Sequence, residues 1–125
     1  MKSINNCTLI GVEGVEKRIP QFLKAADICQ HYLDFTNVKL LSPFNLERKE
    51  WERIKPMKDR ETYCKFIIKE LHNYIDTTHF LLFQNDGWIL NPDAWEDEFL
   101  NYDYIGAPWT WEEFPCGNGG FTLRS

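Results

Sequence analysis

The feature that most restricts the fold is a helix-like segment that leads into a short apolar run. Residues 61–75 (ETYCKFIIKELHNYI) place Tyr63, Phe66 and Ile67 on one face at helical spacing. Residues 78–83 (THFLLF) follow and are typical of a buried strand. A helix joined to a buried strand is the repeating unit of an α/β sheet, so this segment predicts an α/β fold.

The first third of the chain shows the same alternation. Residues 7–14 (CTLIGVEG) predict a buried strand that ends in turn residues. Residues 20–33 predict a helix that begins at Pro20, and residues 38–43 (VKLLSP) predict a second strand. Because a strand-helix-strand unit places its strands side by side and parallel, we expect a mostly parallel central sheet.

The other segments complete the expected order. Residues 44–61 are a charged connector, 88–90 a short strand, 91–102 a short helix and 103–109 a last strand. We therefore expect one domain over residues 1–125. In such open sheets ligands bind outside the carboxyl ends of the strands, so functional residues should follow the strands.

Composition narrows the function classes. The chain has 14 Lys and Arg against 19 Asp and Glu, a formal net charge of −5 at pH 7. A nucleic-acid binder depends on neutralising phosphates, so we expect no nucleic-acid partner. A nucleotide stays compatible, because a few backbone N–H groups or a metal ion can hold its phosphates. No apolar run approaches the ~20 residues of a membrane span, so we expect none.

The cysteines indicate a reducing compartment. Cys7, Cys29, Cys64 and Cys116 are scattered, with no CxxC pair and no histidine at zinc-ligand spacing. We interpret them as free thiols of a cytoplasmic protein. Residues 1–10 (MKSINNCTLI) contain no apolar signal-peptide core, which favours the same location.

The sharpest local feature follows the strand at residues 78–83. There the chain reads Gln84, Asn85, Asp86 and Gly87. Side chains two apart in an extended segment point the same way, and carboxylate and amide oxygens suit Mg²⁺ or Mn²⁺ carrying a diphosphate. The alternative is an ordinary Asn-Asp-Gly hairpin turn.

Two later loops carry further candidates. The glycine-rich stretch at residues 117–125 (GNGGFTLRS) could expose successive N–H groups to a ligand or form a tight turn between strands. Trp109 and Trp111 could stack on a sugar face or pack in the core. The candidate acid–base groups near these loops are Asp103, Glu112 and Glu113.

Together these motifs resemble a known family. Residues 80–109 (FLLFQNDGWILNPDAWEDEFLNYDYIGAPW), followed by 117–125 (GNGGFTLRS), resemble an uncharacterised family related to glycosyltransferases. That family carries Q-x-D-G, Y-D-Y-I-G-A-P-W and G-N-G-G-F-[ST]-L-R-S in the same order, and the upstream half matches it only in layout. The family is similar to nucleotide-sugar transferases of the GT-A fold. This resemblance implies a Rossmann-like α/β sandwich.

The resemblance implies a donor site. In GT-A enzymes an Asp-x-Asp at a strand end binds Mn²⁺ or Mg²⁺ and the diphosphate of the sugar nucleotide. The second Asp falls on Asp86, and the first falls on Gln84, an amide where the pattern has a carboxylate. The implied positions near the nucleotide base are Val12, Glu13, Arg60 and Tyr63. The implied positions in an acceptor-side or donor-sugar loop are Asn118, Gly119 and Gly120.

The reaction implied is displacement at the anomeric carbon, with a carbohydrate or glycan as acceptor. GT-A domains usually exceed this length, so the chain is expected to be a truncated member, incomplete at its C-terminus, that holds the donor-side half. A cut sheet exposes an edge, which favours self-association as a homo-oligomer. The alternatives are a non-catalytic nucleotide- or sugar-binding or assembly module, and a phosphoryl- or nucleotidyl-transferring enzyme that uses Asp86.

Overall fold

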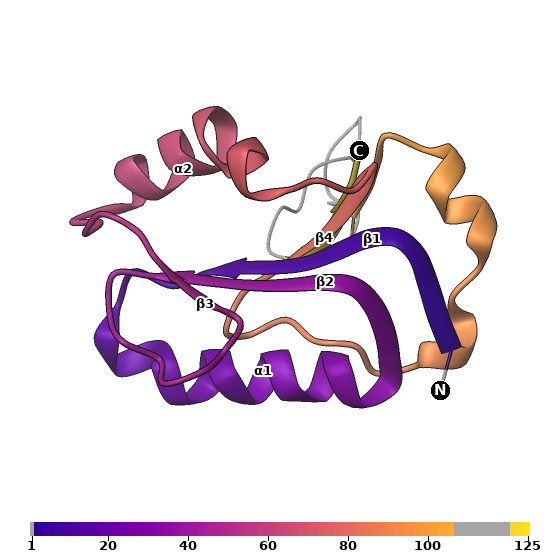
Figure 1. Cartoon of the computed structure of the whole chain (residues 1–125), viewed down its shortest axis with the longest axis horizontal. Helices are drawn as coiled ribbons and strands as arrows, with labels where there is room; N and C mark the ends of the chain where they lie inside the picture. The colour runs from indigo at the N-terminus through magenta and orange to yellow at the C-terminus, as the bar shows by residue number, and fades with distance from the viewer. Residues whose placement is uncertain (1, 107–120) are drawn as a thin grey trace, which may run out of the picture.

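The computed structural model describes residues 2–106 and 121–125. In this part of the chain six strands form one mixed sheet, and one α-helix covers each of its faces (Figure 1). The α/β fold class is therefore confirmed. Several predicted site residues lie outside the described residues: Trp109, Trp111, Glu112, Glu113, Asn118, Gly119 and Gly120.

The first strand, helix and second strand form as predicted, with longer bounds. They are β1 (Lys2–Val12), α1 (Ile19–Tyr32) and β2 (Leu33–Ser42). Pro20 lies in the first turn of α1, where a backbone N–H would have no partner within the helix. β2 begins directly after α1 and pairs in parallel with β1.

The charged connector contains a strand that the sequence analysis did not predict. β3 (Trp51–Arg53) pairs in parallel with the outer side of β2. Its sequence, WER, has no apolar run because an edge strand buries little of its surface. The indole Nε1–H of Trp51 donates to the carbonyl oxygen of Ser42 at 3.0 Å, which ties the two strands together.

The second helix, α2 (Arg60–Lys69), is shorter than the predicted residues 61–75. A 3-10 turn, η2 (Leu71–Tyr74), replaces its last part. At the other end, the backbone N–H of Thr62 donates to the Asp59 carboxylate at 2.8 Å, an N-cap that fixes where the helix begins.

The last three strands complete the sheet. β4 (His79–Phe83) pairs in parallel with β1, on the side away from β2. β6 (Phe121–Arg124) is antiparallel to β4, and β5 (Tyr104–Gly106) is antiparallel to β6. The strand order is β3-β2-β1-β4-β6-β5, so the sheet is mostly parallel, with β6 as the antiparallel member.

Two predictions for the region after β4 are wrong. Residues 88–90 form no strand, and two 3-10 turns, η3 (Pro92–Ala94) and η4 (Asp97–Asn101), replace the single helix predicted at 91–102. Pro and Asp open the first turn, and the second is rich in acidic side chains. Asn and Asp, whose side chains compete with the helix backbone and favour caps and turns, occur at positions 91, 93, 97 and 101 and interrupt a longer helix.

The strand order reverses within the sheet. The connection through α1 places β2 on one side of β1. The connection from β3 through α2 places β4 on the other side of β1. The strand order therefore reverses between β1 and β4, and ligands bind at such a point outside the carboxyl ends of the strands. We call the end of the sheet formed by the last residues of β3, β2, β1 and β4 the carboxyl edge.

The core beside this edge is tightly packed. Phe22 of α1 and Phe83 of β4 are fully buried and stack with ring centroids 5.0 Å apart. Both rings lie against Gly11 of β1, where an added Cβ would lie 2.5 Å from a Phe83 ring carbon and 2.6 Å from one of Phe22. Only glycine allows this approach, so Gly11 fixes how α1 and β4 meet next to the carboxyl edge.

Candidate functional site

The carboxyl edge brings together segments that are far apart in the sequence. Gly11 pairs with Phe83, so Val12 at the end of β1 and the following Glu13 lie beside Gln84 and Asn85, which follow β4. The Val12 side chain is buried in the core on the α2 side. It shapes the edge through its main chain rather than through a side chain that a ligand could contact.

Gln84 is held by a hydrogen bond to the opposite helix. Its amide Nε2 donates to the Tyr63 hydroxyl oxygen at 3.1 Å. Burial raises the pKa of Tyr63, so this hydroxyl stays neutral at physiological pH. Because the side-chain nitrogen of Gln84 makes this hydrogen bond, its side-chain carbonyl oxygen remains as an acceptor or a cation ligand.

The residues after β4 form a tight turn. The backbone N–H of Gly87 donates to the backbone carbonyl oxygen of Gln84 at 3.1 Å. The Asn85 side-chain amide donates to the Gln21 side-chain carbonyl at 3.1 Å, which links this turn to the first turns of α1. Asp86 is exposed. No strand follows the turn, so the hairpin alternative is not what the described residues form.

Glu13 is a buried carboxyl group at the same edge. Its exposed fraction is 5%. The backbone N–H of Val15 donates to one of its oxygens at 3.2 Å. Burial raises the pKa of Glu13. The hydrogen bond from Val15 and the charge of Arg18 oppose that shift, and the charge of Asp86 adds to it. Glu13 and Asp86 are therefore close enough to influence each other electrostatically.

The loop before α2 closes the edge from the β3 side. A Cβ added at Gly14 would lie 3.0 Å from the Cβ of Met57, so the loops after β1 and β3 touch. Arg60 is exposed at the first residue of α2. Both α1 and α2 begin at this edge, and the positive end of each helix dipole therefore faces it.

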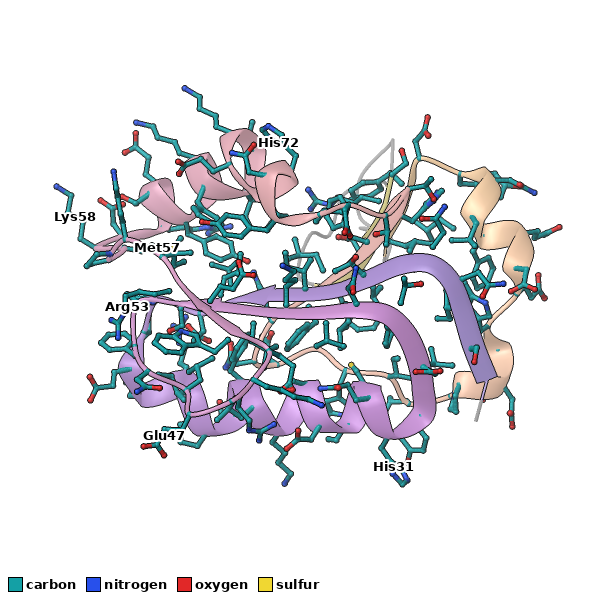
Figure 2. All side chains as sticks on the ribbon, in the orientation of Figure 1. His31, Glu47, Arg53, Met57, Lys58 and His72 are labelled. Carbon is teal, nitrogen blue, oxygen red and sulfur yellow. The ribbon has the colours of Figure 1, made fainter. Side chains whose placement is uncertain are left out.

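The edge is more basic than the rest of the chain. Residues 13–18, 53–60 and 84–88 hold six basic and four acidic side chains, whereas the whole chain has a net charge of −5. Figure 2 shows Arg53 and Lys58 at this end of the molecule. The exposed basic side chains are Lys17, Arg18, Arg53, Lys55, Lys58 and Arg60. An anionic ligand is therefore favoured here over other parts of the surface.

Asp103 does not belong to this group. It precedes β5, whose register through β6 aligns Tyr104 with Phe80 at the start of β4. It therefore lies at the amino end of the parallel strands, away from the carboxyl edge. Its carboxylate accepts the Ser125 hydroxyl at 2.8 Å, an interaction that joins β5 to the end of β6.

The donor set for a cation is small. Among residues 2–106 and 121–125 no three His, Cys, Asp or Glu side chains group as metal ligands. Asp86 supplies one carboxylate, and Gln84 supplies one amide oxygen. Two hard oxygens fit a Mg²⁺ or Mn²⁺ ion that takes its other ligands from phosphates and water. They do not fit a metal held by protein alone.

The structure adds two residues that the sequence analysis missed, Gln21 and Trp88. Trp88 follows Asp86 by two residues, and its exposed fraction is 42%. It lines a hollow of about 440 Å³ against the outer side of α1. Its position next to the aspartate was a usable signal, but the tryptophan was interpreted as part of a strand. A second hollow of about 440 Å³ lies between residues 55–57 and α2.

None of the helices in the described residues is both long and apolar enough to cross a membrane. Comparisons with curated proteins and with solved structures find no match. A family model described as "Protein of unknown function (DUF5672)" matches residues 44–125, more than half of the chain. The matched part includes α2, β4 and the turn that holds Gln84 and Asp86. The chain therefore belongs to the DUF5672 family of proteins of unknown function.

Proposed function

We propose that this chain binds a nucleotide sugar at the carboxyl edge and acts in glycosyl transfer, with a fold of the GT-A type. A mostly parallel α/β sheet with one helix on each face supports the proposal at the level of architecture. The edge lies where the strand order reverses, which is where open α/β sheets bind nucleotides.

The observation that carries the proposal is the arrangement after β4. Gln84 is oriented by Tyr63, and the exposed carboxylate of Asp86 follows it at the end of a buried strand. Exposed basic side chains lie on the same edge, in the loop after β1 and from the end of β3 to the start of α2. An anion with its own cation would be attracted by the basic loops and held by the two side-chain oxygens.

The residues present fit a Mg²⁺ or Mn²⁺ ion that arrives with a diphosphate. When bound, such an ion neutralises the charge of a nucleoside diphosphate leaving group. The chain's own part is to hold it: Asp86 supplies the charged oxygen, and Tyr63 keeps the Gln84 amide turned so that its oxygen stays available. The buried Glu13 lies beside them, where a nucleotide base is proposed to bind.

In the proposed reaction a hydroxyl group of a carbohydrate or glycan acceptor attacks the anomeric carbon. The bond from that carbon to the diphosphate breaks, and the hydroxyl proton passes to a base. Glu112 and Glu113 stay the candidate bases, since Asp103 lies at the opposite edge of the sheet. Cys7, Cys29 and Cys64 are free thiols, which fits the proposed cytoplasmic location.

Thermal unfolding with UDP, GDP and their sugars, each with and without Mn²⁺, tests the donor site. We expect one nucleotide to raise Tm only when Mn²⁺ is present, because the protein alone offers two oxygen ligands. At [L] = 100 Kd the gain is about 2.7 kcal/mol. The increase should vanish in Asp86→Asn and persist in Asp93→Asn, a matched change at an exposed aspartate of η3. If no nucleotide moves Tm under either condition, the donor site is refuted.

A second candidate function is a non-catalytic nucleotide- or sugar-binding module. The amide at Gln84 favours it, because a neutral ligand holds a cation less strongly than the carboxylate of an Asp-x-Asp pair. A rise in Tm with nucleotide or sugar alone, unaffected by Mn²⁺, would support this candidate over the transferase.

A further inference from the structure

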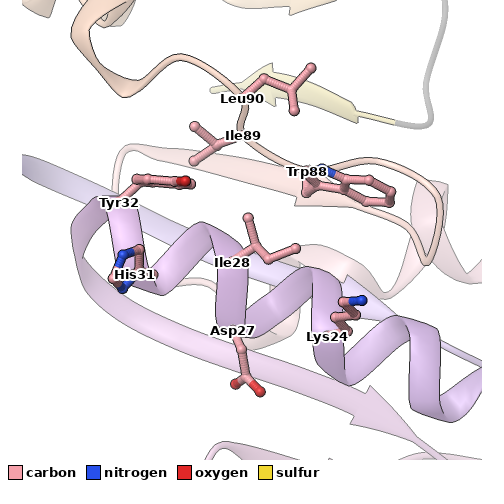
Figure 3. A pocket seen from close by; sticks show the side chains of 8 residues that line it. All are labelled: Lys24, Asp27, Ile28, His31, Tyr32, Trp88, Ile89 and Leu90. Carbon is pink, nitrogen blue, oxygen red and sulfur yellow. The ribbon is translucent and has the colours of Figure 1, made fainter.

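The hollow beside α1 is lined by one face of that helix and by the extended residues 88–90 (Figure 3). Five residues come from one stripe of the helix, and three come from the extended segment after the Asp86 turn. They are Lys24, Asp27, Ile28, His31 and Tyr32, and Trp88, Ile89 and Leu90. Figure 3 shows Trp88 and Tyr32 at opposite ends of the hollow, with Ile28 between them.

The aromatic rings at its ends are open to solvent. Trp88 has an exposed fraction of 42% and Tyr32 one of 39%. The face of an indole ring is electron-rich and attracts the C–H groups on the apolar face of a pyranose. Because the two rings lie at the two ends, the hollow presents a stacking surface to more than one sugar unit.

Polar groups line the same hollow. Lys24 and His31 are exposed on α1; the Lys24 ammonium can donate to hydroxyl groups, and the His31 ring can donate to them or accept from them. The Asp27 carboxylate receives two hydrogen bonds from the Arg48 guanidinium, at 2.7 and 3.0 Å. That pairing keeps Asp27 ionised, and Figure 3 shows its carboxylate pointing away from Trp88, so Lys24 and His31 are the polar side chains available to a ligand in the hollow. A few polar groups around an apolar floor are typical of small-molecule sites.

The hollow begins next to the proposed donor site. Trp88 is two residues from Asp86, and two residues span at most about 7 Å. That is roughly the length of one sugar unit. We propose that this hollow binds a carbohydrate chain that stacks on Trp88. Its role as the acceptor rests on the proposed function, whereas carbohydrate binding itself does not.

Titration of ¹⁵N-labelled protein with cellotetraose, maltotetraose, chitotetraose and mannotetraose tests the inference without nucleotide or metal. We expect at least one of them to shift the amide signals of residues 24–32 and 88–90 at about millimolar affinity. The shifts should weaken about tenfold or more in Trp88→Ala. In Trp88→Phe they should be partly retained, because a smaller aromatic ring can still stack.

Tyr102→Ala is the matched control, since Tyr102 is an exposed aromatic residue outside the hollow. Its affinity should match that of the wild type. Amide spectra of each variant without sugar show whether it is folded. The inference is overturned if none of the four sugars shifts these signals at about 50 mM, or if Trp88→Ala binds as well as the wild type. An apolar peptide or detergent that shifts these signals when no sugar does would also overturn it.

The two proposals fail separately. If an oligosaccharide binds while no nucleotide with Mn²⁺ raises Tm, the carbohydrate site stands and the donor site falls. If a nucleotide binds through Asp86 while no oligosaccharide does, the donor site stands and the hollow has no such role.

Discussion

Gly11→Ala is expected to destabilise the fold next to the carboxyl edge. The added Cβ would lie 2.5 and 2.6 Å from two ring carbons of Phe83 and 2.6 Å from one of Phe22. Carbon atoms pack best at about 3.5–4.0 Å, so the rings would have to move by roughly 1 Å. Both side chains are fully buried and stacked on each other, so neither can move without displacing α1 or β4.

The magnitude follows from the cost of overpacking a dense core, about 1–3 kcal/mol in free energy of unfolding. For a chain of this size that corresponds to a fall in Tm of roughly 4 °C for each kcal/mol. Urea unfolding followed by circular dichroism measures it: the midpoint should fall while the slope m stays the same. Ser3→Ala, an exposed position of β1, serves as the control and should change stability by less than about 0.5 kcal/mol.

A double variant separates this packing effect from a general loss of strand stability. In Gly11→Ala/Phe83→Leu the two Phe83 ring carbons nearest the added methyl group are absent. Phe22 then gains room to shift. The double variant should therefore be less destabilised than the sum of the single variants by about 0.5–3 kcal/mol. Additive single effects, or a Gly11→Ala variant as stable as the wild type, would refute the reasoning.

Three other predictions concern single groups. Burial raises the pKa of Glu13 above its ordinary 4.5. The stability of the wild type relative to Glu13→Gln should therefore be constant below pH 4.5 and decline as pH rises from there through the folded-state pKa. Urea unfolding of both proteins at several pH values measures this difference. Tyr63→Phe should cost about 0.5–1.5 kcal/mol of stability and weaken nucleotide binding in calorimetry, because the strand-end glutamine loses its partner; equal affinity would contradict the site. In a Cys116→Ser background, the exposed Cys64 should react at once with a thiol reagent. Cys7 and Cys29 should react only on unfolding, since burial raises their pKa to about 12 and about 11.

Much of the fold was predictable because its central elements have strong periodicity. The apolar runs of β1, β2 and β4 lie in the middle of the sheet, and the apolar face of α1 packs against it, so these segments bury most of their surface. β3 and β6 were missed for physical reasons. β3 is a polar edge strand of three residues, and β6 pairs between strands far from it in sequence. Short-range patterns do not specify such long-range pairing.

The sequence placed the strand-end residues correctly but not all of their neighbours. Gln84 and Tyr63 meet because α2, which carries Tyr63, packs over β4, the strand that ends just before Gln84. The predicted helix followed by a buried strand implies this arrangement. Asp103 was grouped with this edge because it is close to the later loops in sequence, yet the antiparallel insertion of β6 places it at the other end of the sheet. Trp88 was missed because an exposed tryptophan and a buried one look the same in a sequence.

The most direct test of the central claim is to locate a bound cation by paramagnetic broadening. Mn²⁺ is added to ¹⁵N-labelled protein together with UDP or GDP, and the loss of amide signals is mapped on the chain. The account predicts that signals of residues 13–15 and 84–87 disappear first, only when nucleotide is present, and remain in Asp86→Asn. Broadening centred on the acidic turns at residues 93–98, or on Asp103, with the carboxyl edge unaffected, would contradict it.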